Sequence, residues 1–543
     1  MESKPWYHSA VFYEVYVRAF CDSNGDGHGD LNGLTQKLDY LKSLGVDCLW
    51  LLPIYPSPLK DDGYDIADYT GIHPDYGTLD DFKRLLAEVH ARGMYLITDL
   101  VVNHTSDRHP WFQAARADRN SPFRDYYVWS DTDQKYKDAR IIFLDTEKSN
   151  WTWDPLAGQF FWHRFFSSQP DLNFDNPKVQ DEMLTVMDFW LALGVDGFRV
   201  DAVPYLFERE GTSCENLPET HAYLRRMRAH VDEKFPGRVL LCEANQWPRD
   251  VRPYFGDDDE FNLAFHFPLM PRIFMALKRG DRQPIAWALE QTPAIPDGCQ
   301  WVTFLRNHDE LTLEMVTPEE RQWMWQEYAP EPRMKQNLGI RRRLAPLLDN
   351  DPRKLTLAFS LLFTLPGAPI VYYGDEIGMG DDIWLDDRNG LRTPMQWAAA
   401  QGGGFSSAAK TYAPLVSTAP YAPEQVNVAA QQADPGSRLH ALEKMIAVRK
   451  AHPALQGRDY RLLEGGPKSL LAVVRRSEGE QVLAVHNLGA GTETFACTLG
   501  TAQAPVTDLL TGLPEAVQAG RLSVRLEPFQ VRWWSLPVAA GID

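Results

Sequence analysis

The sequence predicts an α/β protein, a (β/α)8 TIM barrel with an inserted subdomain after strand 3 and a C-terminal antiparallel β-domain. Two observations carry this prediction. Short apolar runs alternate with amphipathic helical patterns through most of the chain. Runs such as CLWLL and YLITDLVV are apolar throughout, as strands covered on both faces are. Eight such units favour a closed barrel over an open, doubly wound sheet.

Eight segments are expected to form the barrel strands. In chain order they are Val11–Val17, Cys48–Leu52, Met94–Val101, Gly197–Asp201, Arg238–Glu243, Phe261–Phe267, Val302–Asn307 and Ile370–Tyr373. Amphipathic helices such as Leu34–Leu44, Leu79–Ala91 and Val179–Leu193 separate several of them. The barrel is therefore expected to comprise residues 1–103 and 174–455.

Two insertions and one further domain complete the predicted organisation. Residues 104–173 are long, aromatic and irregular, which predicts a small subdomain folded over the barrel mouth. Residues 311–351 follow the seventh strand and are expected to form a helical insertion. Over 456–543, segments such as SLLAVVRR and VRWWSL alternate with glycine-containing turns, which predicts the antiparallel β-domain.

The composition indicates an acidic cytoplasmic protein. The formal charge of −19 argues against nucleic-acid and anionic-membrane partners. The six cysteines show no CxxC pair and are expected to be reduced thiols. No signal-peptide pattern begins the chain. The apolar stretch Leu355–Tyr373 is cut by Pro366, Gly367 and Pro369 into pieces too short to span a membrane.

Charged and polar side chains gather where four predicted strands end, the face on which barrel enzymes carry their active sites. They are Asp99, Asn103 and His104 after the third strand, Arg199 and Asp201 at the fourth, Glu243 at the fifth, and Arg306, His308 and Asp309 at the seventh. Carboxylates held close together raise one another's pKa, so that one stays protonated near neutral pH. A buried structural ion pair between Arg199 and Asp201 is the alternative for those two residues, but the whole set at successive strand ends favours catalysis.

The four segments that carry these residues are DLVVNHTS, GFRVDAVPY, LLCEANQW and FLRNHDE. They resemble the diagnostic motifs of the α-amylase superfamily, glycoside hydrolase family 13, as do GVDCLWLLPIYPSP and GAPIVYYGDEIGM at the second and eighth strands. The resemblance covers essentially the whole chain and implies a retaining double displacement. Asp201 would be the nucleophile, Glu243 the general acid/base, and Asp309 the residue that holds the ring hydroxyls. Retaining carboxyl pairs lie about 5 Å apart, close enough for a covalent glycosyl-enzyme.

The same resemblance implies a pocket for one terminal glucose. The implied contacts are hydroxyl binding by His104 and His308, a charge from Arg199 that keeps Asp201 ionised, stacking by Tyr64, and closure of the far end by Asp61 and Arg392. The segment QPDLNFDNP resembles the oligo-1,6-glucosidase branch, whose members have such pockets. Ala202, which follows the nucleophile, favours α-1,4 or α-1,1 bonds over α-1,6 bonds.

Within that branch, long stretches resemble the trehalose synthase family, the maltose α-D-glucosyltransferases. Among them are SPLKDDGYDIADYTGIHPDYGTLDDF, ARIIFLDTEKSNWTWD, EANQWP and FLRNHDELTLEMVT. The resemblance implies isomerisation of maltose to trehalose by intramolecular transfer, with some glucose released. The freed glucose must be held while it turns, and water must be kept from the glycosyl-enzyme. Candidates to hold it or to seal the mouth are Asn245, Gln246, Arg140, Glu310 and Glu314. An Arg140–Glu310 ion pair is the expected latch, and ordinary solvated loop charges are the alternative.

Two other functions compete with this interpretation. A hydrolytic α-glucosidase acting on maltose or sucrose would release glucose as its main product. An inactive barrel that serves as a partner subunit, like the amino-acid transporter heavy chains, would need a membrane segment and would have lost its carboxylates; neither is seen. The glycine-rich stretch AAAQGGGFSSA departs from the family pattern and leaves the extent of hydrolysis open. Family members form dimers or tetramers and carry or partner with a maltokinase, which would here be a separate chain.

One loop carries the spacing of a metal site. Residues 22–30 place oxygen side chains at alternate positions with Gly27 at the turn, like the first nine positions of an EF-hand loop. Gly33 stands where an EF-hand has glutamate, so this is not an EF-hand. A dinucleotide-binding glycine loop is rejected because the acids would repel a pyrophosphate. The loop resembles the calcium or magnesium loop of the oligo-1,6-glucosidase branch, with ligands Asp22, Asn24, Asp26, the His28 carbonyl and Asp30. A metal-free turn is the alternative.

A second metal site is implied by resemblance alone. Its ligands would be Asn103, Asp171 and Glu208, with the carbonyls of Tyr205 and Leu206, and they would bind Ca2+ between barrel and subdomain. A plain strand-end amide is the alternative role for Asn103. Both metals would be structural, since two carboxyl groups suffice for glycosidic cleavage.

Overall fold

The computed structural model describes residues 5–500, 505–536 and 541–542. Its centre is a closed barrel of parallel strands, namely β1 (Phe12–Val15), β2 (Cys48–Leu51), β3 (Tyr95–Val101), β7 (Gly197–Asp201), β8 (Val239–Cys242), β9 (Leu263–Phe265), β10 (Gln300–Phe304) and β14 (Ala368–Tyr372). Neighbours in the barrel follow the order of the chain, and β14 pairs with β1 to close it. The predicted barrel and its eight strand segments are confirmed.

The barrel strands are buried on both faces, which explains their uninterrupted apolar runs. Every residue of β2 and β7 is buried, as is every residue of β3 after Tyr95. Some of the helices around them bury only one face. In α4 (Leu79–Ala91) the buried positions Phe82, Leu85, Leu86 and Val89 recur at helical spacing.

Some helices of the barrel region begin or end at caps that the sequence supplies. Thr78 and Asp81 form a capping box at the start of α4, and Gly194 ends α6 in the left-handed region. The other helices are α1 (Val17–Phe20), α2 (Leu31–Gln36), α3 (Leu38–Leu44), α6 (Pro177–Leu193), α7 (Pro218–Lys234), α8 (Pro248–Val251), α9 (Leu269–Arg279), α10 (Gln283–Glu290), α13 (Pro352–Thr364), α14 (Val428–Ala433), α15 (Arg438–Ala451) and α16 (Pro453–Gln456). Within the described part of the chain, no helix is long and apolar enough to cross a membrane.

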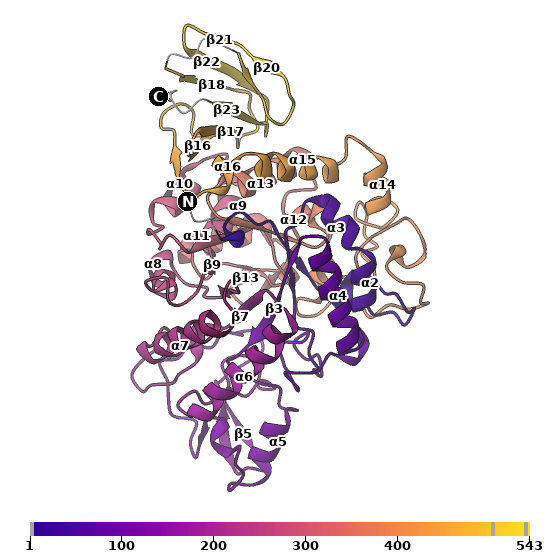
Figure 1. Ribbon diagram of the computed structural model, residues 1–543, viewed down its shortest axis with the longest axis vertical. Coiled ribbons are helices and arrows are strands. Elements are labelled where there is room, and N and C mark those ends of the chain that lie inside the picture. The colour runs from indigo at the N-terminus through magenta and orange to yellow at the C-terminus, as the bar shows by residue number, and fades with distance from the viewer. Residues whose placement is uncertain (1–4, 501–504, 537–540, 543) are drawn as a thin grey trace.

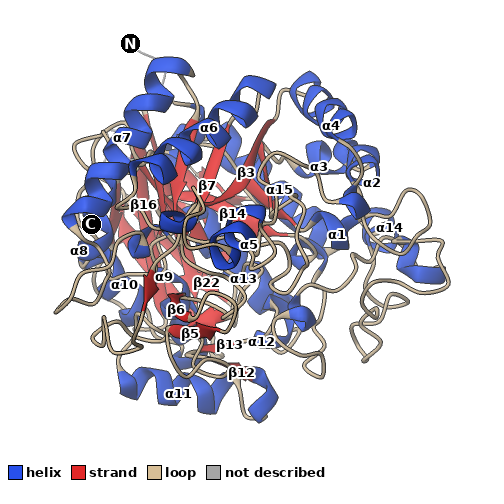
Figure 2. Cartoon of the chain, turned by 90° about the horizontal axis from the view of Figure 1, so that it is seen from below, coloured by secondary structure: helices blue, strands red, loops and turns tan. Residues whose placement is uncertain are grey.

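The subdomain after β3 and the C-terminal domain lie at opposite ends of the molecule (Figure 1). The subdomain contains α5 (Pro110–Ala117) and an antiparallel sheet of β4 (Trp129–Ser130), β6 (Gln159–Trp162) and β5 (Trp151–Asp154). Seen from its own end, it lies in front of the barrel strands (Figure 2). It therefore covers the barrel mouth, as the sequence predicts.

The insertion after β10 differs from the expected helical segment. It contains the three-turn helix α11 (Pro318–Tyr328) and the short α12 (Leu344–Leu347). It also contains a three-stranded sheet of β11 (Leu311–Thr312), β13 (Gly339–Ile340) and β12 (Lys335–Gln336). Two-residue strands are too short to give an alternating pattern, so the sequence could not reveal them.

The C-terminal domain is the expected antiparallel β-domain. One sheet contains β15 (Tyr460–Leu462), β16 (Leu470–Ser477), β17 (Glu480–Asn487) and β23 (Val531–Leu536). A second contains β18 (Glu493–Thr498), β22 (Arg521–Leu526) and β21 (Val517–Gln518), and β19 (Val506–Thr507) pairs with β20 (Pro514–Glu515). Trp533 of β23 donates to the Ser360 hydroxyl of α13 at 2.8 Å. The domain is thereby docked on the barrel helices, away from the mouth.

Candidate active site

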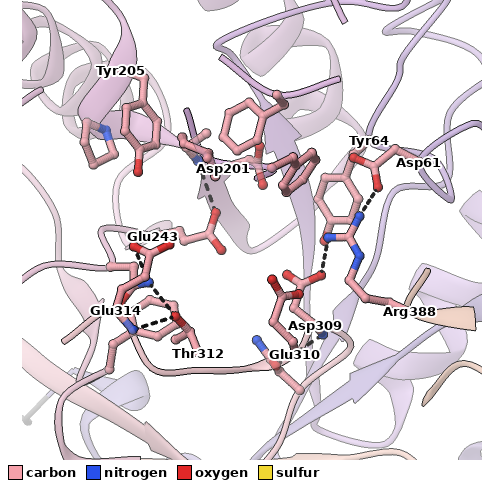
Figure 3. Close-up of a pocket in the computed structure, with 18 of the residues that line it drawn as sticks. Asp61, Tyr64, Asp201, Tyr205, Glu243, Asp309, Glu310, Thr312, Glu314 and Arg388 are labelled. Atoms are coloured by element: carbon pink, nitrogen blue, oxygen red, sulfur yellow. Dashed lines mark hydrogen bonds and ion pairs between the residues drawn. The ribbon is translucent and has the colours of Figure 1, made fainter. Parts of the chain in front are cut away.

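Six of the residues singled out in the sequence line one cavity at the barrel mouth. They are Asp61, Tyr64, His104, Asp201, Glu243 and Asp309. Asn245, Glu310 and Glu314 line it as well, and the cavity with its open mouth encloses about 850 Å3. Figure 3 shows Asp201, Glu243 and Asp309 around one central space, with Arg388 beside Asp61. The strand ends therefore converge as a barrel requires.

The register of two neighbouring strands brings the candidate nucleophile and acid together. Asp201 is the last residue of β7, and Glu243 follows β8 directly. Val200 of β7 lies opposite Cys242 of β8, so the next residue on each strand reaches the same level of the barrel. A Glu243 carboxylate oxygen accepts from the Ala202 amide at 3.1 Å, which fixes its position beside Asp201.

A single guanidinium connects three carboxyl groups of the site, of which Asp99 and Asp201 are buried and Glu243 is partly exposed to the cavity. Arg199 donates to Asp99 at 2.6 Å and to Asp201 at 2.7 Å, and its other terminal nitrogen pairs with Glu243. One positive charge faces three acids in a buried site, so the fully ionised set is disfavoured. At least one of these carboxyls therefore tends to hold a proton near neutral pH.

The pKa values separate an acid from a nucleophile. Burial raises the pKa of Glu243 to about 7, although the charge of Arg199 opposes the rise. Burial raises the pKa of Asp201 to about 6, again against Arg199. Between about pH 6 and 7 the predominant form of the pair is therefore a protonated Glu243 beside an ionised Asp201, the division of roles that a retaining glycosidase needs.

Asp309 is kept ionised by three cations. Burial alone would raise its pKa, but His308 and Arg388 hold the pKa well below its usual range. The His308 Nε2 lies 3.2 Å from Asp309. Burial alone would lower the pKa of His308, but Asp309 and Glu14 raise it to about 9. Glu14, which lies 2.5 Å from the His308 Nδ1, thus helps to hold a charged imidazole against Asp309.

Of the other predicted sugar contacts, Tyr64 and His104 line the cavity, whereas His308 and Arg199 do not. The Tyr64 ring lies parallel to His308, with a ring-centre separation of 5.3 Å and an interplanar angle of 9°. The Tyr64 hydroxyl donates to Asp99 at 3.0 Å. Burial lowers the pKa of His104 to about 3, so its imidazole is neutral. A neutral imidazole offers one donor and one acceptor, which suits a sugar hydroxyl.

The far end of the cavity is closed by an arginine that the sequence argument missed. Arg388 pairs with Asp61 at 2.5 Å and with Asp309 at 2.8 Å. Arg392, the expected partner of Asp61, instead pairs with Asp62 and with Asp309 at 2.9 Å, and it does not line the cavity. The two arginines stand four residues apart in DDRNGLR, in a segment without periodicity. Position in the sequence therefore could not decide which of them faces the sugar.

The expected latch exists with a different partner. Arg140 of the subdomain pairs with Glu215 at 2.8 Å and with Glu314 of the insertion at 2.9 Å, and not with Glu310. Glu310 accepts instead from the side-chain amide of Asn337 at 3.1 Å. Glu310 directly follows Asp309 on the inner wall, whereas Glu314 comes after β11 and lies opposite Arg140.

Three further contacts support this bridge over the mouth. Asn245 donates to Glu314 at 3.1 Å, so the acceptor-side wall is tied to the latch. Gln246 does not line the cavity; it donates to Glu215 at 3.1 Å. Asp145 of the subdomain accepts from the backbone amide of Asn337, in the insertion, at 2.8 Å. Subdomain and insertion are thus joined at two points above the carboxyl pair.

The predicted site of Asn103, Asp171 and Glu208 fits a hard cation. One carboxylate oxygen of Asp171 and one of Glu208 are buried without a hydrogen-bond partner. Burial raises the pKa of Asp171 to about 8 and that of Glu208 well above its usual range, and the negative charge of Asp171 adds to the rise at Glu208. Paired buried oxygens of this kind are what Ca2+ coordinates, and oxygens of Asn103, Tyr205 and Leu206 would complete the set.

The loop of residues 22–30 lacks such unpartnered buried carboxylate oxygens. Asp22 accepts from the amides of Gly25 and Gly27, and Asp30 accepts from Ser23 and from the Gly33 amide, where it caps α2. None of its carboxylate oxygens is buried without a partner. Across the described residues, no three His, Cys, Asp or Glu side chains are grouped to hold a metal ion. The metal ion expected in the loop of residues 22–30 stays a prediction.

Comparisons with known proteins agree with this geometry. The family model described as the α-amylase catalytic domain matches residues 14–457. The trehalose synthase/amylase TreS of Mycobacterium tuberculosis is 59% identical over 89% of this chain and 82% of its own length. The trehalose synthase of Pimelobacter sp. is 55% identical over 94% of this chain and 92% of its own.

A solved structure shows the same architecture. The trehalulose synthase MutB of Pseudomonas mesoacidophila MX-45 superposes with a TM-score of 0.79 at 31% identity, covering 98% of this chain and 100% of that one. Relatives named as glucosidases are less similar, such as a probable α-glucosidase of Rhizobium meliloti at 34% identity. The chain belongs to the α-amylase family and, within it, to the group of proteins named trehalose synthases.

Proposed function

We propose that this protein isomerises maltose to trehalose through a covalent β-glucosyl-enzyme, with some hydrolysis to glucose. The observation that carries the proposal is the double bridge over the cavity. The Arg140–Glu314 pair and the Asp145–Asn337 contact join the subdomain to the insertion above the carboxyl pair. An enzyme that hydrolyses its substrate gains nothing from contacts that restrain the mouth on the acceptor side, whereas an isomerase must retain its leaving group.

The first step cleaves the α-1,4 bond of maltose. An Asp201 carboxylate oxygen attacks the anomeric carbon of the non-reducing glucose, while Glu243 donates its proton to the departing O4. Arg199 touches both carboxyls and compensates the charge that Glu243 acquires. Asp309, ionised between His308 and Arg388, is placed to hold ring hydroxyls as positive charge develops on the sugar.

The second step makes the α-1,1 bond. The freed glucose turns within the cavity until its anomeric hydroxyl faces the glucosyl-enzyme. Glu243, now a carboxylate, takes the proton of that hydroxyl, the oxygen attacks the anomeric carbon, and Asp201 departs. No water is consumed, so maltose and trehalose interconvert. Attack by water in place of the sugar gives two glucose molecules, which is the hydrolytic side reaction.

The closed far end limits the substrate to one glucosyl unit beyond the cleavage point. Arg388 joins Asp61 to Asp309 there, so a longer chain cannot pass through the cavity. The test of the proposed activity is a time course with purified protein and either disaccharide. Maltose and trehalose should approach the same mixture from both directions, and Asp201→Asn should abolish the reaction. Glucose as the main product from maltose would replace the proposal with an α-glucosidase.

Two structural features and the partners extend the proposal. A structural Ca2+ held by Asn103, Asp171 and Glu208 would join β3 to the subdomain, and its chemistry would be charge compensation, because cleavage proceeds on the two carboxyls alone. All six cysteines are buried and unpaired, which supports a reducing, cytoplasmic setting. Homo-oligomerisation and a separate maltokinase chain stay part of the proposal. Chromatographic mass measurement, alone and with the kinase, tests both.

A further inference from the structure

A second pocket lies outside the active cavity. Trp247, of the EANQWP segment, lines a surface pocket together with Trp287 of α10. No residue lines both this pocket and the active cavity. The pocket has a volume of about 490 Å3, within the range of about 300–1,000 Å3 that small-molecule sites occupy.

The pocket has an aromatic wall built on a buried cation. The Trp247 and Trp287 rings meet edge to face, with centres 6.1 Å apart. The Arg272 guanidinium carbon lies 4.2 Å from the Trp287 ring centre and 5.5 Å from that of Trp247. Because Arg272 is only 2% exposed, it supports the indoles from the protein side. Trp287 itself is half-buried, so part of its indole is open to a ligand.

Polar side chains flank the exposed indole at regular spacing. Gln283 and Gln291 stand four residues before and four residues after Trp287, so all three project from one side of α10. Both glutamines are exposed, and Thr317 and Glu320 face them from the insertion after β10. The pocket thus combines one exposed indole face, that of Trp287, with amide, hydroxyl and carboxylate groups around it.

This combination fits a sugar ring. A glucosyl ring carries C–H groups on its faces, which pack on the electron-rich face of an indole, and hydroxyl groups on its edge, which bond to amides and carboxylates. A purely apolar ligand would cover the exposed amides of Gln283 and Gln291 without bonding to them. Glu320 is already bonded to the Thr317 amide and to Arg272, so a neutral hydroxyl ligand can bond to its carboxylate without separating that charge from its partners. The geometry points to a second sugar-binding site that takes a glucosyl unit of maltose or a longer α-glucan.

An occupant of this pocket would touch both halves of the acceptor-side wall. Trp247 stands two residues after Asn245, and Arg272 donates to the carbonyl of Met315, which follows Glu314. Asn245 and Glu314 bond to each other in the active cavity. A sugar held between Trp247 and Thr317 therefore clamps the contact that retains the freed glucose. Only this consequence, and not the binding itself, rests on the proposed function.

Calorimetric titration of the Asp201→Ala protein with maltose tests the inference, because this variant binds without turnover. We expect two sugars per chain, one of which is lost in Asp201→Ala/Trp287→Ala. Trp153→Ala removes an indole that is 50% exposed on the subdomain and serves as the matched control. Gln283→Ala/Gln291→Ala alters only exposed side chains and should weaken the second site at least severalfold.

The outcomes separate the two claims. Unchanged stoichiometry and affinity in both the Trp287 and the glutamine variants would overturn the second site. If the active cavity did not take maltose, the titration would give a single site that Trp287→Ala removes and Asp309→Ala leaves intact. That result would support the second site and contradict the proposed function.

Discussion

Replacing Arg140 with alanine removes the side chain that joins the subdomain to the insertion over the active cavity. Its guanidinium contacts Glu215 at 2.8 Å, Glu314 at 2.9 Å and the Tyr205 hydroxyl at 3.2 Å. Of these partners only Glu314 belongs to the insertion. The carboxyl pair and Arg199 are untouched by the change. The variant is therefore expected to open the mouth and to spare the bond-breaking step.

The magnitude follows from one charged hydrogen bond across the mouth. Such bonds contribute about 1.5–3 kcal/mol when well protected from solvent. The Arg140 side chain is 34% exposed, which reduces the contribution of its bond to Glu314 toward about 1 kcal/mol. A change of about 1 kcal/mol shifts the opening equilibrium about fivefold. The ratio of glucose to trehalose should rise by that factor, while maltose consumption changes by less than about twofold.

The assay is the initial rate of each product from maltose, resolved by chromatography. Arg140→Lys keeps the charge but cannot hold both glutamates, so its ratio should lie between those of the wild type and Arg140→Ala. Arg119→Ala, elsewhere on the subdomain, is the matched control. A double-mutant cycle that combines Arg140→Ala with Glu314→Gln should show that their effects on the ratio of glucose to trehalose are not additive. An unchanged product ratio in Arg140→Ala, with no coupling to Glu314, would refute the latch.

Three further predictions concern proton transfer, the closed end and the cation. The profile of kcat/KM against pH should rise through about 6 as Asp201 ionises and fall through about 7 as Glu243 loses its proton; an optimum above pH 9 would contradict the assignment. Arg388→Ala should lower kcat/KM for maltose by about 10–100-fold through lost charged bonds to Asp61 and Asp309, and it should allow slow cleavage of maltotriose; unaltered chain-length specificity would contradict the closed end. The pKa of Asp171 is raised to about 8, so from about pH 4 to 8 the unfolded protein has released this proton while the folded protein without the cation still holds it, and the folded state loses stability as pH rises. Chelation should therefore lower Tm more at pH 8 than at pH 5, and Asp171→Asn should remove that difference; a Tm that is indifferent to chelator in the wild type would argue against the cation.

The fold and the carboxyl pair could be predicted because both depend on local sequence. An apolar run marks a strand covered on both faces, and the residue that ends it must emerge at the barrel rim. Asp201 and Glu243 end such runs directly, so their convergence required only that the strands be neighbours. His308 and Asp309 follow β10 after a short turn and were found in the same way.

The rest of the site depends on contacts that no local pattern encodes. Arg388 lies in a long segment after β14 that has only short 3-10 turns and the helix α14, so nothing in its spacing shows which way it points. The insertion after β10 carries two glutamates within five residues, and opposite charge alone cannot choose between Glu310 and Glu314 as the partner of Arg140. Only the turn through β11, which directs Glu314 toward the subdomain, decides that pairing.

The central claim is that the enzyme keeps its own glucose between the two steps. Its most direct test is incubation of the purified protein with unlabelled maltose and an excess of isotopically labelled glucose, with products separated by chromatography and weighed by mass spectrometry. We expect trehalose that is almost entirely unlabelled, with a small amount of glucose. Heavily labelled trehalose would show an open site that exchanges its acceptor, and glucose alone would show a hydrolase.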